Sequence, residues 1–155
     1  MVERKEKPRR IAAPDGAPRP SGDISQTPAY RVLVVEDFAP IRREICFTLA
    51  SDARLQVIGE AADGLEAVQM AAELKPDLIF LDIGLPKMDG FQVAHRILTS
   101  APQTRIIFVS QQSSPEIIEE ALKLGRAFIP KRRIVTQLLA AVNAVISEQV
   151  FVAKM

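Results

Sequence analysis

Residues 78–90 read LIFLDIGLPKMDG, a stretch that passes from an unbroken apolar run to a carboxylate and then to turn residues. The apolar run 78–81 predicts a short strand that is buried on both faces of a sheet. Asp82 stands where this strand ends, and Pro86 with Asp89-Gly90 marks a loop before a helical pattern that opens at Phe91. A single acidic residue at a strand end is common in loops. A functional role for Asp82 therefore requires that other polar residues lie at the same edge of the sheet.

Composition favours one globular domain and excludes several other classes of protein. Of the 155 residues 48% are hydrophobic, and the net charge of +1 predicts no overall attraction to nucleic acid or to an anionic membrane. The single cysteine, Cys46, cannot form an internal disulfide, and its helical pattern favours a small buried side chain. Because no apolar stretch could span a bilayer and no signal-peptide core is present, we expect a cytoplasmic protein.

The first 29 residues differ in composition from the rest of the chain. They hold five of the eleven prolines and six of the twenty Lys and Arg residues, with almost no large apolar side chains. We therefore expect residues 1–29 to be a disordered Pro/Arg-rich tail, and residues 30–155 to form the folded domain. Within that domain, residues 148–155 are a candidate start of a linker.

From residue 30 onward, short apolar runs alternate with amphipathic helical patterns. Strands are predicted at 32–35, 55–61, 78–81, 106–109 and 128–129. Helices are predicted from Pro40, from the capping pair Asp63 and Glu66, from Phe91, from Pro115 to a stop at Gly125, and over the apolar stripe 138–146. Five apolar strands alternating with five helices imply an α/β fold, a parallel sheet covered on both faces. Right-handed crossovers then bring all the strand C-termini to one edge.

Polar residues follow the apolar strands directly at that edge, where such sheets bind ligands. They are Glu36, Asp37, Asp82, Ser110 and Lys131. Three converging carboxylates need a cation, and Mg²⁺ suits carboxylate oxygens. An ammonium and a hydroxyl beside that ion suit a phosphoryl group. No Gly-rich nucleotide loop is present, so the phosphate comes from elsewhere, and Asp82 is the candidate nucleophile that accepts it.

The chain resembles the receiver domains of two-component response regulators, in pattern most of all those of LuxR/NarL-type regulators. The resemblance is carried by Val34-Val35-Glu36-Asp37, by residues 82–86 with Asp89-Gly90, by Ser110, and by Phe128-Ile129-Pro130-Lys131. It implies a flavodoxin-like (βα)5 fold with strand order 2-1-3-4-5. It also implies that Asp82 takes phosphate from a histidine kinase or phosphotransfer protein, as a signalling domain rather than a conventional enzyme.

The resemblance assigns roles to the remaining site residues as well. It implies that Mg²⁺ is held by Asp37, Asp82 and the main-chain carbonyl of Gly84, with Glu36 mainly reaching it through water. Ser110 and Phe128 fill the switch positions, although ordinary core packing also explains Phe128. The surface of the fourth helix, fifth strand and fifth helix would carry the output to a protein target or into a homodimer.

Several features leave other readings open. Gln111 is bulkier than the family's usual small residue, Arg132 stands where proline is common, and the approach from Gly125 to Phe128 is short. These departures allow a receiver-like adaptor that works without phosphorylation. The chain is either a single-domain regulator, which we favour, or the receiver half of a DNA-binding transcription regulator. We expect no contact with nucleic acid within these residues, and no membrane partner. His95, the only histidine, is expected to be exposed or partly packed.

Overall fold

The apolar runs form the strands of a parallel sheet, as their lack of a polar face predicts. The computed structural model describes residues 29–153, so all but the last residue of the predicted tail lies outside the described residues. The strands are β1 (Tyr30–Val35), β2 (Leu55–Ala61), β3 (Leu78–Asp82), β4 (Arg105–Ser110), β5 (Ala127–Pro130) and β6 (Phe151–Val152). Their order is β2-β1-β3-β4-β5-β6, which confirms the predicted flavodoxin-like arrangement and adds one strand.

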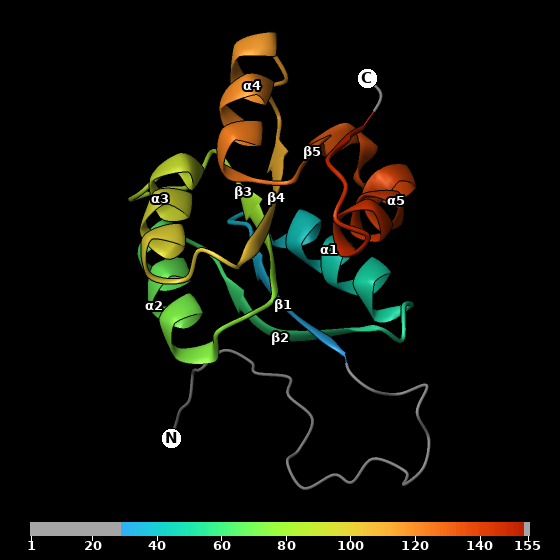
Figure 1. Cartoon of the computed structure of the whole chain (residues 1–155), viewed down its shortest axis with the longest axis horizontal. Coiled ribbons are helices and arrows are strands. Elements are labelled where there is room, and N and C mark those ends of the chain that lie inside the picture. The colour runs from blue at the N-terminus through green and yellow to red at the C-terminus, as the bar shows by residue number, and fades with distance from the viewer. Residues whose placement is uncertain (1–28, 154–155) are drawn as a thin grey trace, which may run out of the picture.

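Five α-helices cover the two faces of this sheet (Figure 1), and a short 3-10 helix, η2 (Lys131–Arg133), precedes the last of them. The α-helices are α1 (Ala39–Ala50), α2 (Gly64–Leu74), α3 (Gly90–Ser100), α4 (Pro115–Leu124) and α5 (Ile134–Ile146). Helices α1 and α5 pack on one face, and α2, α3 and α4 pack on the other. Successive strand residues point to opposite faces, so Leu33 joins one apolar core and Val34 the other. Among the described residues, no helix is long and apolar enough to cross a membrane.

Capping residues mark the helix boundaries; the cap at Asp63 was predicted from the sequence, whereas the cap at Asp89 was not. The Asp63 side chain accepts a hydrogen bond from the Glu66 N–H at 2.8 Å and starts α2. A capping box between Asp89 and Gln92 starts α3 at Gly90. Helix α4 ends before Gly125, whose backbone is extended with φ −114°. Glycine is needed there because a Cβ would lie 2.7 Å from the Ile106 carbonyl oxygen, so the reason is close packing rather than a left-handed cap.

Strand β6 is a difference from the sequence prediction, which placed a linker start in this segment. After α5, the chain turns at Glu148 (φ 64°), whose carboxylate lies 2.9 Å from the Arg105 guanidinium. The chain then pairs in parallel with β5, through hydrogen bonds from the Phe151 N–H to Arg126 at 2.9 Å and from the Ala153 N–H to Phe128 at 3.1 Å. Ala153 is fully buried. The segment thus covers the outer edge of β5.

Candidate functional site

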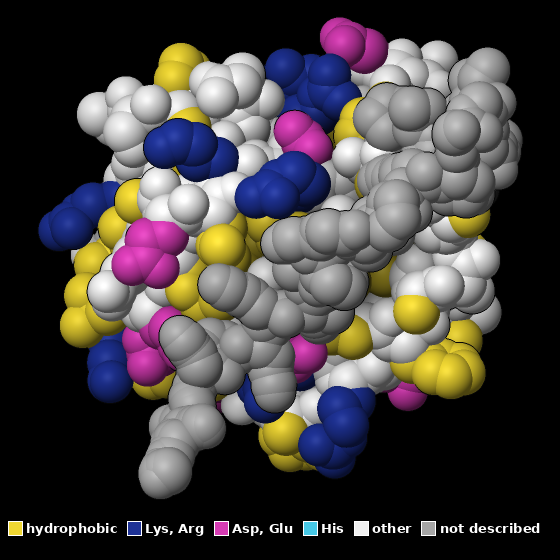
Figure 2. Space-filling model, turned by 90° about the horizontal axis from the view of Figure 1, so that it is seen from below, with side chains coloured by type: hydrophobic (Ala, Val, Ile, Leu, Met, Phe, Trp, Pro, Cys, Tyr) yellow, Lys and Arg dark blue, Asp and Glu magenta, His cyan; other side chains and the backbone are white. Residues whose placement is uncertain are grey.

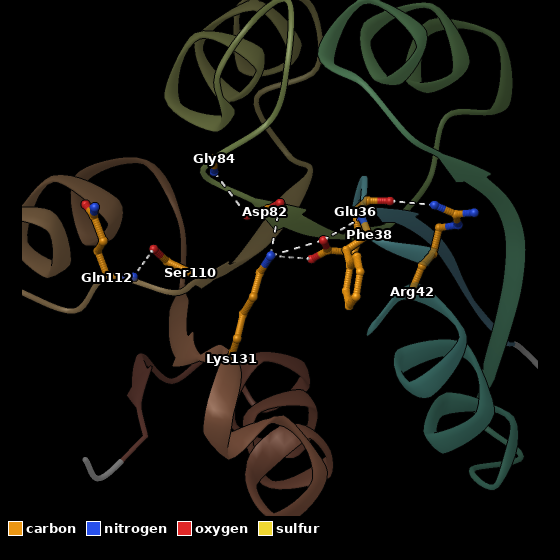
Figure 3. A network of polar contacts seen from close by, with 8 residues as sticks. All are labelled: Glu36, Phe38, Arg42, Asp82, Gly84, Ser110, Gln112 and Lys131. Atoms are coloured by element: carbon orange, nitrogen blue, oxygen red, sulfur yellow. Dashed lines mark hydrogen bonds and ion pairs between the residues drawn. The ribbon is translucent and has the colours of Figure 1, made fainter. Parts of the chain in front are cut away.

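The predicted site residues meet at the C-terminal edge of the sheet (Figure 3). Asp82 and Ser110 are the last residues of β3 and β4, while Glu36 and Lys131 directly follow β1 and β5. Ligand atoms of Glu36, Asp37 and Asp82 lie within 4.8 Å of one another. Glu36 and Asp82 are buried, whereas Asp37 is exposed. Parallel topology brings the strand ends that carry these groups to one edge, although the groups are far apart in the sequence.

The Lys131 ammonium joins the two buried carboxylates. Its Nζ lies 3.0 Å from Glu36 Oε2 and 3.2 Å from Asp82 Oδ2, and it donates a hydrogen bond to each. Backbone N–H groups complete the set, because that of Phe38 donates to Glu36 Oε2 and that of Gly84 donates to Asp82 Oδ1, both at 3.0 Å. The ammonium and the two N–H groups thus fix the positions of both carboxylates.

Burial dominates the electrostatics of the site. Burial raises the pKa of Glu36 from 4.5 to about 7, and the neighbouring Asp82 adds to this, while the Phe38 N–H and Lys131 oppose it. Burial also raises the pKa of Asp82, against the opposing charge of Lys131. Burial lowers the pKa of Lys131, but its bonds to Glu36 and Asp82 outweigh that effect, so the pKa of this ammonium lies above its usual value. The pKa values of both buried carboxyls thus stay raised although Lys131 lies beside them, so a further positive charge at the site would stabilise their ionised forms.

The residues present fit a hard divalent cation such as Mg²⁺. Although Lys131 Nζ lies 3.0 Å from Glu36 Oε1, this buried oxygen has no hydrogen-bond partner among the described residues. The Lys131 ammonium is an ion-pair partner of this oxygen but does not satisfy it with a hydrogen bond, so the oxygen stays free to coordinate a metal ion. The three carboxylates supply the oxygen ligands that Mg²⁺ prefers. Gly84 contacts Asp82 through its N–H, and the role of its carbonyl as a ligand stays a prediction.

The predicted switch residues are both buried. Ser110 is 4% exposed, and its Oγ accepts a hydrogen bond from the Gln112 N–H at 3.0 Å. Phe128 is fully buried in the core beneath α2, α3 and α4, which is compatible with either of the roles considered for it. The bulky Gln111 is exposed. Lys131 reaches the site although arginine follows it, so a proline at position 132 is not required for this contact.

One residue considered from the sequence lies away from the site, and one residue that contacts the site was not predicted. His95 is exposed on α3, as expected. Arg42, in the first turn of α1, was not singled out from the sequence, yet it donates to the Glu36 carbonyl at 2.8 Å and to Glu60 Oε1 at 3.1 Å. The sequence did offer one indication of this contact: Arg42 lies five residues after Asp37, in the first turn of the helix that follows β1.

A cavity of about 570 Å³ among the described residues lies away from this site. It lies at the opposite edge of the sheet, between the first residues of β1 and β4 and the last turns of α2 and α3, where Tyr30, Lys75, Ser100 and Arg105 line it. Figure 2 views the molecule from this side, and the part formed by described residues has basic side chains interspersed with acidic ones. The candidate site is therefore identified by its buried charges rather than by its volume.

Comparison with known proteins agrees with this geometry. A family model of the response regulator receiver domain matches residues 32–143. The chain is 35% identical over 95 residues, 61% of its length, to the uncharacterized transcriptional regulatory protein YhcZ of Bacillus subtilis, of which it covers 44%. It is 41% identical over 95 residues to protein-glutamate methylesterase/protein-glutamine glutaminase 3 of Geobacter sulfurreducens, again 61% of the chain, and covers 25% of that protein.

Solved structures show the same relationship. The response regulator domain of Thermotoga maritima CheB superimposes with a TM-score of 0.71 at 34% identity, covering 77% of this chain and 98% of that domain. This chain belongs to the response regulator receiver family. It spans between a quarter and just over half of the length of the first curated relatives.

Proposed function

We propose that this chain is a phosphoacceptor switch that receives a phosphoryl group on Asp82 from the phosphohistidine of a kinase or phosphotransfer protein. The observation that carries the proposal is the Lys131 ammonium, which lies between Glu36 and Asp82 at the edge of the sheet. Such a cation beside a buried carboxylate serves both an ionised nucleophile and an incoming phosphoryl group.

In the proposed reaction an Asp82 carboxylate oxygen attacks phosphorus, the phosphorus–nitrogen bond breaks, and the donor imidazole leaves with that electron pair. Mg²⁺ held by Asp37, Asp82 and the Gly84 carbonyl, with Glu36 reaching it mainly through water, would neutralise charge on the carboxylate and the phosphoryl oxygens. Lys131 would exchange its contact with Asp82 Oδ2 for a phosphoryl oxygen. The Ser110 hydroxyl, now an acceptor for the Gln112 N–H, would turn its proton toward the phosphoryl group. Movement of Ser110 with Phe128 is the proposed switch.

The proposed output surface differs in one respect from that expected from the sequence. Because β6 covers the outer edge of β5, and all four residues of β5 are buried, β5 itself offers little to a partner. We therefore place the proposed contact surface on α4, α5 and β6. Val150 and Val152 expose apolar side chains beside α5.

The test is intact mass spectrometry after incubation with acetyl phosphate and Mg²⁺. We expect one phosphoryl adduct of about 80 Da, absent in Asp82→Asn and in the presence of chelator. The matched control is Asp89→Asn, which changes an exposed acid in the following loop and keeps a good helix cap. No adduct in the wild type at any incubation time, short or long, would refute the proposal and favour an adaptor that works without phosphorylation.

A further inference from the structure

The Arg42 side chain connects the loop after β1, which carries Glu36, to the neighbouring strand β2, which carries Glu60. From the first turn of α1, Nη1 donates to the main-chain carbonyl of Glu36 at 2.8 Å, and Nε donates to Glu60 Oε1 on β2 at 3.1 Å (Figure 3 shows Arg42). We propose that Arg42 and Glu60 are a positioning pair that sets the loop 36–38, and with it Asp37, for cation binding. This inference rests on the proposed function, because it concerns the same site.

The loop is fixed through Glu36 at both of its ends. The Glu36 N–H donates to the Ala61 carbonyl at 3.0 Å, and its carboxylate accepts from Phe38 N–H and Lys131. The carbonyl of Glu36 begins the peptide unit that leads into Asp37, and Arg42 is what holds it. Because a peptide unit is planar, a fixed carbonyl also fixes the direction in which Asp37 leaves the strand. Asp37 is exposed, so this backbone restraint matters more than packing around its side chain.

Glu60 gives the pair its electrostatic balance. The Arg42 and Glu60 side chains are 21% and 32% exposed, so solvent screens their charges only partly. A lone guanidinium bound to the Glu36 carbonyl would repel a dication at the neighbouring carboxylates. Glu60 offsets this charge and, through Nε, fixes the plane of the guanidinium that faces the carbonyl. Support of a ligand by such outer partners typically contributes a factor of about 10 to 100 in metal affinity.

Three substitutions separate these contributions. Arg42→Ala removes the support for the carbonyl, and we expect Mg²⁺ affinity to fall about 10-fold or more. Arg42→Lys keeps the positive charge, but an ammonium lacks the planar guanidinium that bonds Glu60 and the Glu36 carbonyl at the same time. We therefore expect an intermediate loss of Mg²⁺ affinity. Glu60→Gln leaves an uncompensated cation, and we expect a loss of about three- to tenfold. In Arg42→Ala, adding Glu60→Gln is expected to cost nothing further, because Glu60 acts through Arg42.

The measurement is a titration of the full chain with Mg²⁺, followed by the shifts of backbone amide signals in nuclear magnetic resonance spectra. The control is Arg43→Ala, which removes an exposed arginine from the same turn of α1 and is expected to bind Mg²⁺ as the wild type does. The initial rate of phosphorylation by acetyl phosphate is measured alongside. We expect Arg42→Ala to need more Mg²⁺ for half-maximal rate and to approach the wild-type rate at saturation.

Wild-type Mg²⁺ affinity in Arg42→Ala or in Glu60→Gln would overturn the inference. If Arg42→Ala does not fold, Arg42→Lys and Glu60→Gln decide, and unchanged affinity in both overturns it. Failure of the proposed function is seen separately, as a wild-type chain that binds Mg²⁺ without forming an adduct. A wild-type chain that binds no Mg²⁺ overturns the inference as well.

Discussion

Metal-free protein should lose stability as the pH rises from 5 to 8, and Glu36 is the reason. Burial raises the pKa of this carboxyl from 4.5 to about 7. In that interval the folded chain binds more protons at Glu36 than the unfolded chain does. Stability therefore falls as pH rises through the window between the two pKa values, and the full cost is present above about pH 7.

The size of the effect follows from the difference between the two pKa values. Each pKa unit corresponds to about 1.4 kcal/mol, so ionising Glu36 in the fold costs about 3 kcal/mol. The side chain is 1% exposed, so solvent does not reduce this cost appreciably. Burial raises the pKa of Asp82 as well, which acts in the same direction. The pKa of Lys131 is raised from 10.5, so its contribution is lost only above the window and leaves the slope unchanged.

The assay is urea unfolding in the presence of chelator at pH 5, 6.5 and 8, followed by far-ultraviolet circular dichroism. We expect the wild type to be about 2 to 3 kcal/mol less stable at pH 8 than at pH 5, and Mg²⁺ to restore most of this at pH 8. Glu36→Gln should remove most of the pH dependence and leave the part due to Asp82, whereas Glu44→Gln, on the exposed side of α1, should leave the profile intact. Stability that is constant or rises over this range in the wild type would refute the reasoning.

Two further predictions concern regions outside the carboxylate cluster. Burial, and then Glu60, raise the pKa of Cys46 to about 12, so we expect alkylation at pH 8.5 to be roughly a thousandfold slower than for a free thiol, and Glu60→Gln to speed it several-fold. An alkylation rate unchanged by Glu60→Gln would contradict this. Ala153→Asp should destabilise the chain by about 2 to 3 kcal/mol, the worth of the two β6 hydrogen bonds and the buried apolar contacts. If the substitution makes β6 detach from β5, the rest of the fold remains. The loss of folding stability is therefore limited to the free energy with which β6 packs against β5. Val152→Asp, at a 41% exposed position, should cost about 0.5 kcal/mol or less in the same urea titrations, and equal losses in the two variants would refute the assignment of β6.

The sequence was sufficient for the fold because its signal is local and repeated. Strands without a polar face are typical of a sheet covered on both sides, and the capping pair at Asp63 marks a helix start. Strand β6 carried no such signal. Two residues show no periodicity, and their pairing depends on the turn at Glu148 and on the free edge of β5. Sequence reasoning therefore found the elements that fold by pattern and missed the one that forms by docking.

The candidate site divides in the same way. Residues that end a strand, such as Asp82 and Ser110, could be placed together because parallel topology decides their position. The pairing of Lys131 with Glu36 joins residues 95 positions apart, and that of Arg42 with Glu60 joins residues 18 apart on neighbouring elements. Both depend on side-chain conformations that no spacing rule supplies. The near-complete burial of Glu36, which sets the largest pKa change in the site, also became visible only in three dimensions.

The charges at this edge explain why the proposed reaction would depend on a divalent cation. Three carboxylates and one ammonium sum to a net charge of −2 when all are ionised, since three negative charges meet one positive charge. Asp82 must be ionised to attack phosphorus, yet burial opposes its ionisation, and Lys131 offsets that only in part. Conversion to an acyl phosphate would add roughly one more negative charge to the same buried space. In the proposed reaction a dication would both hold Asp82 in its reactive form and retain the product, and Asp37, which we propose is positioned by Arg42, would be its exposed ligand.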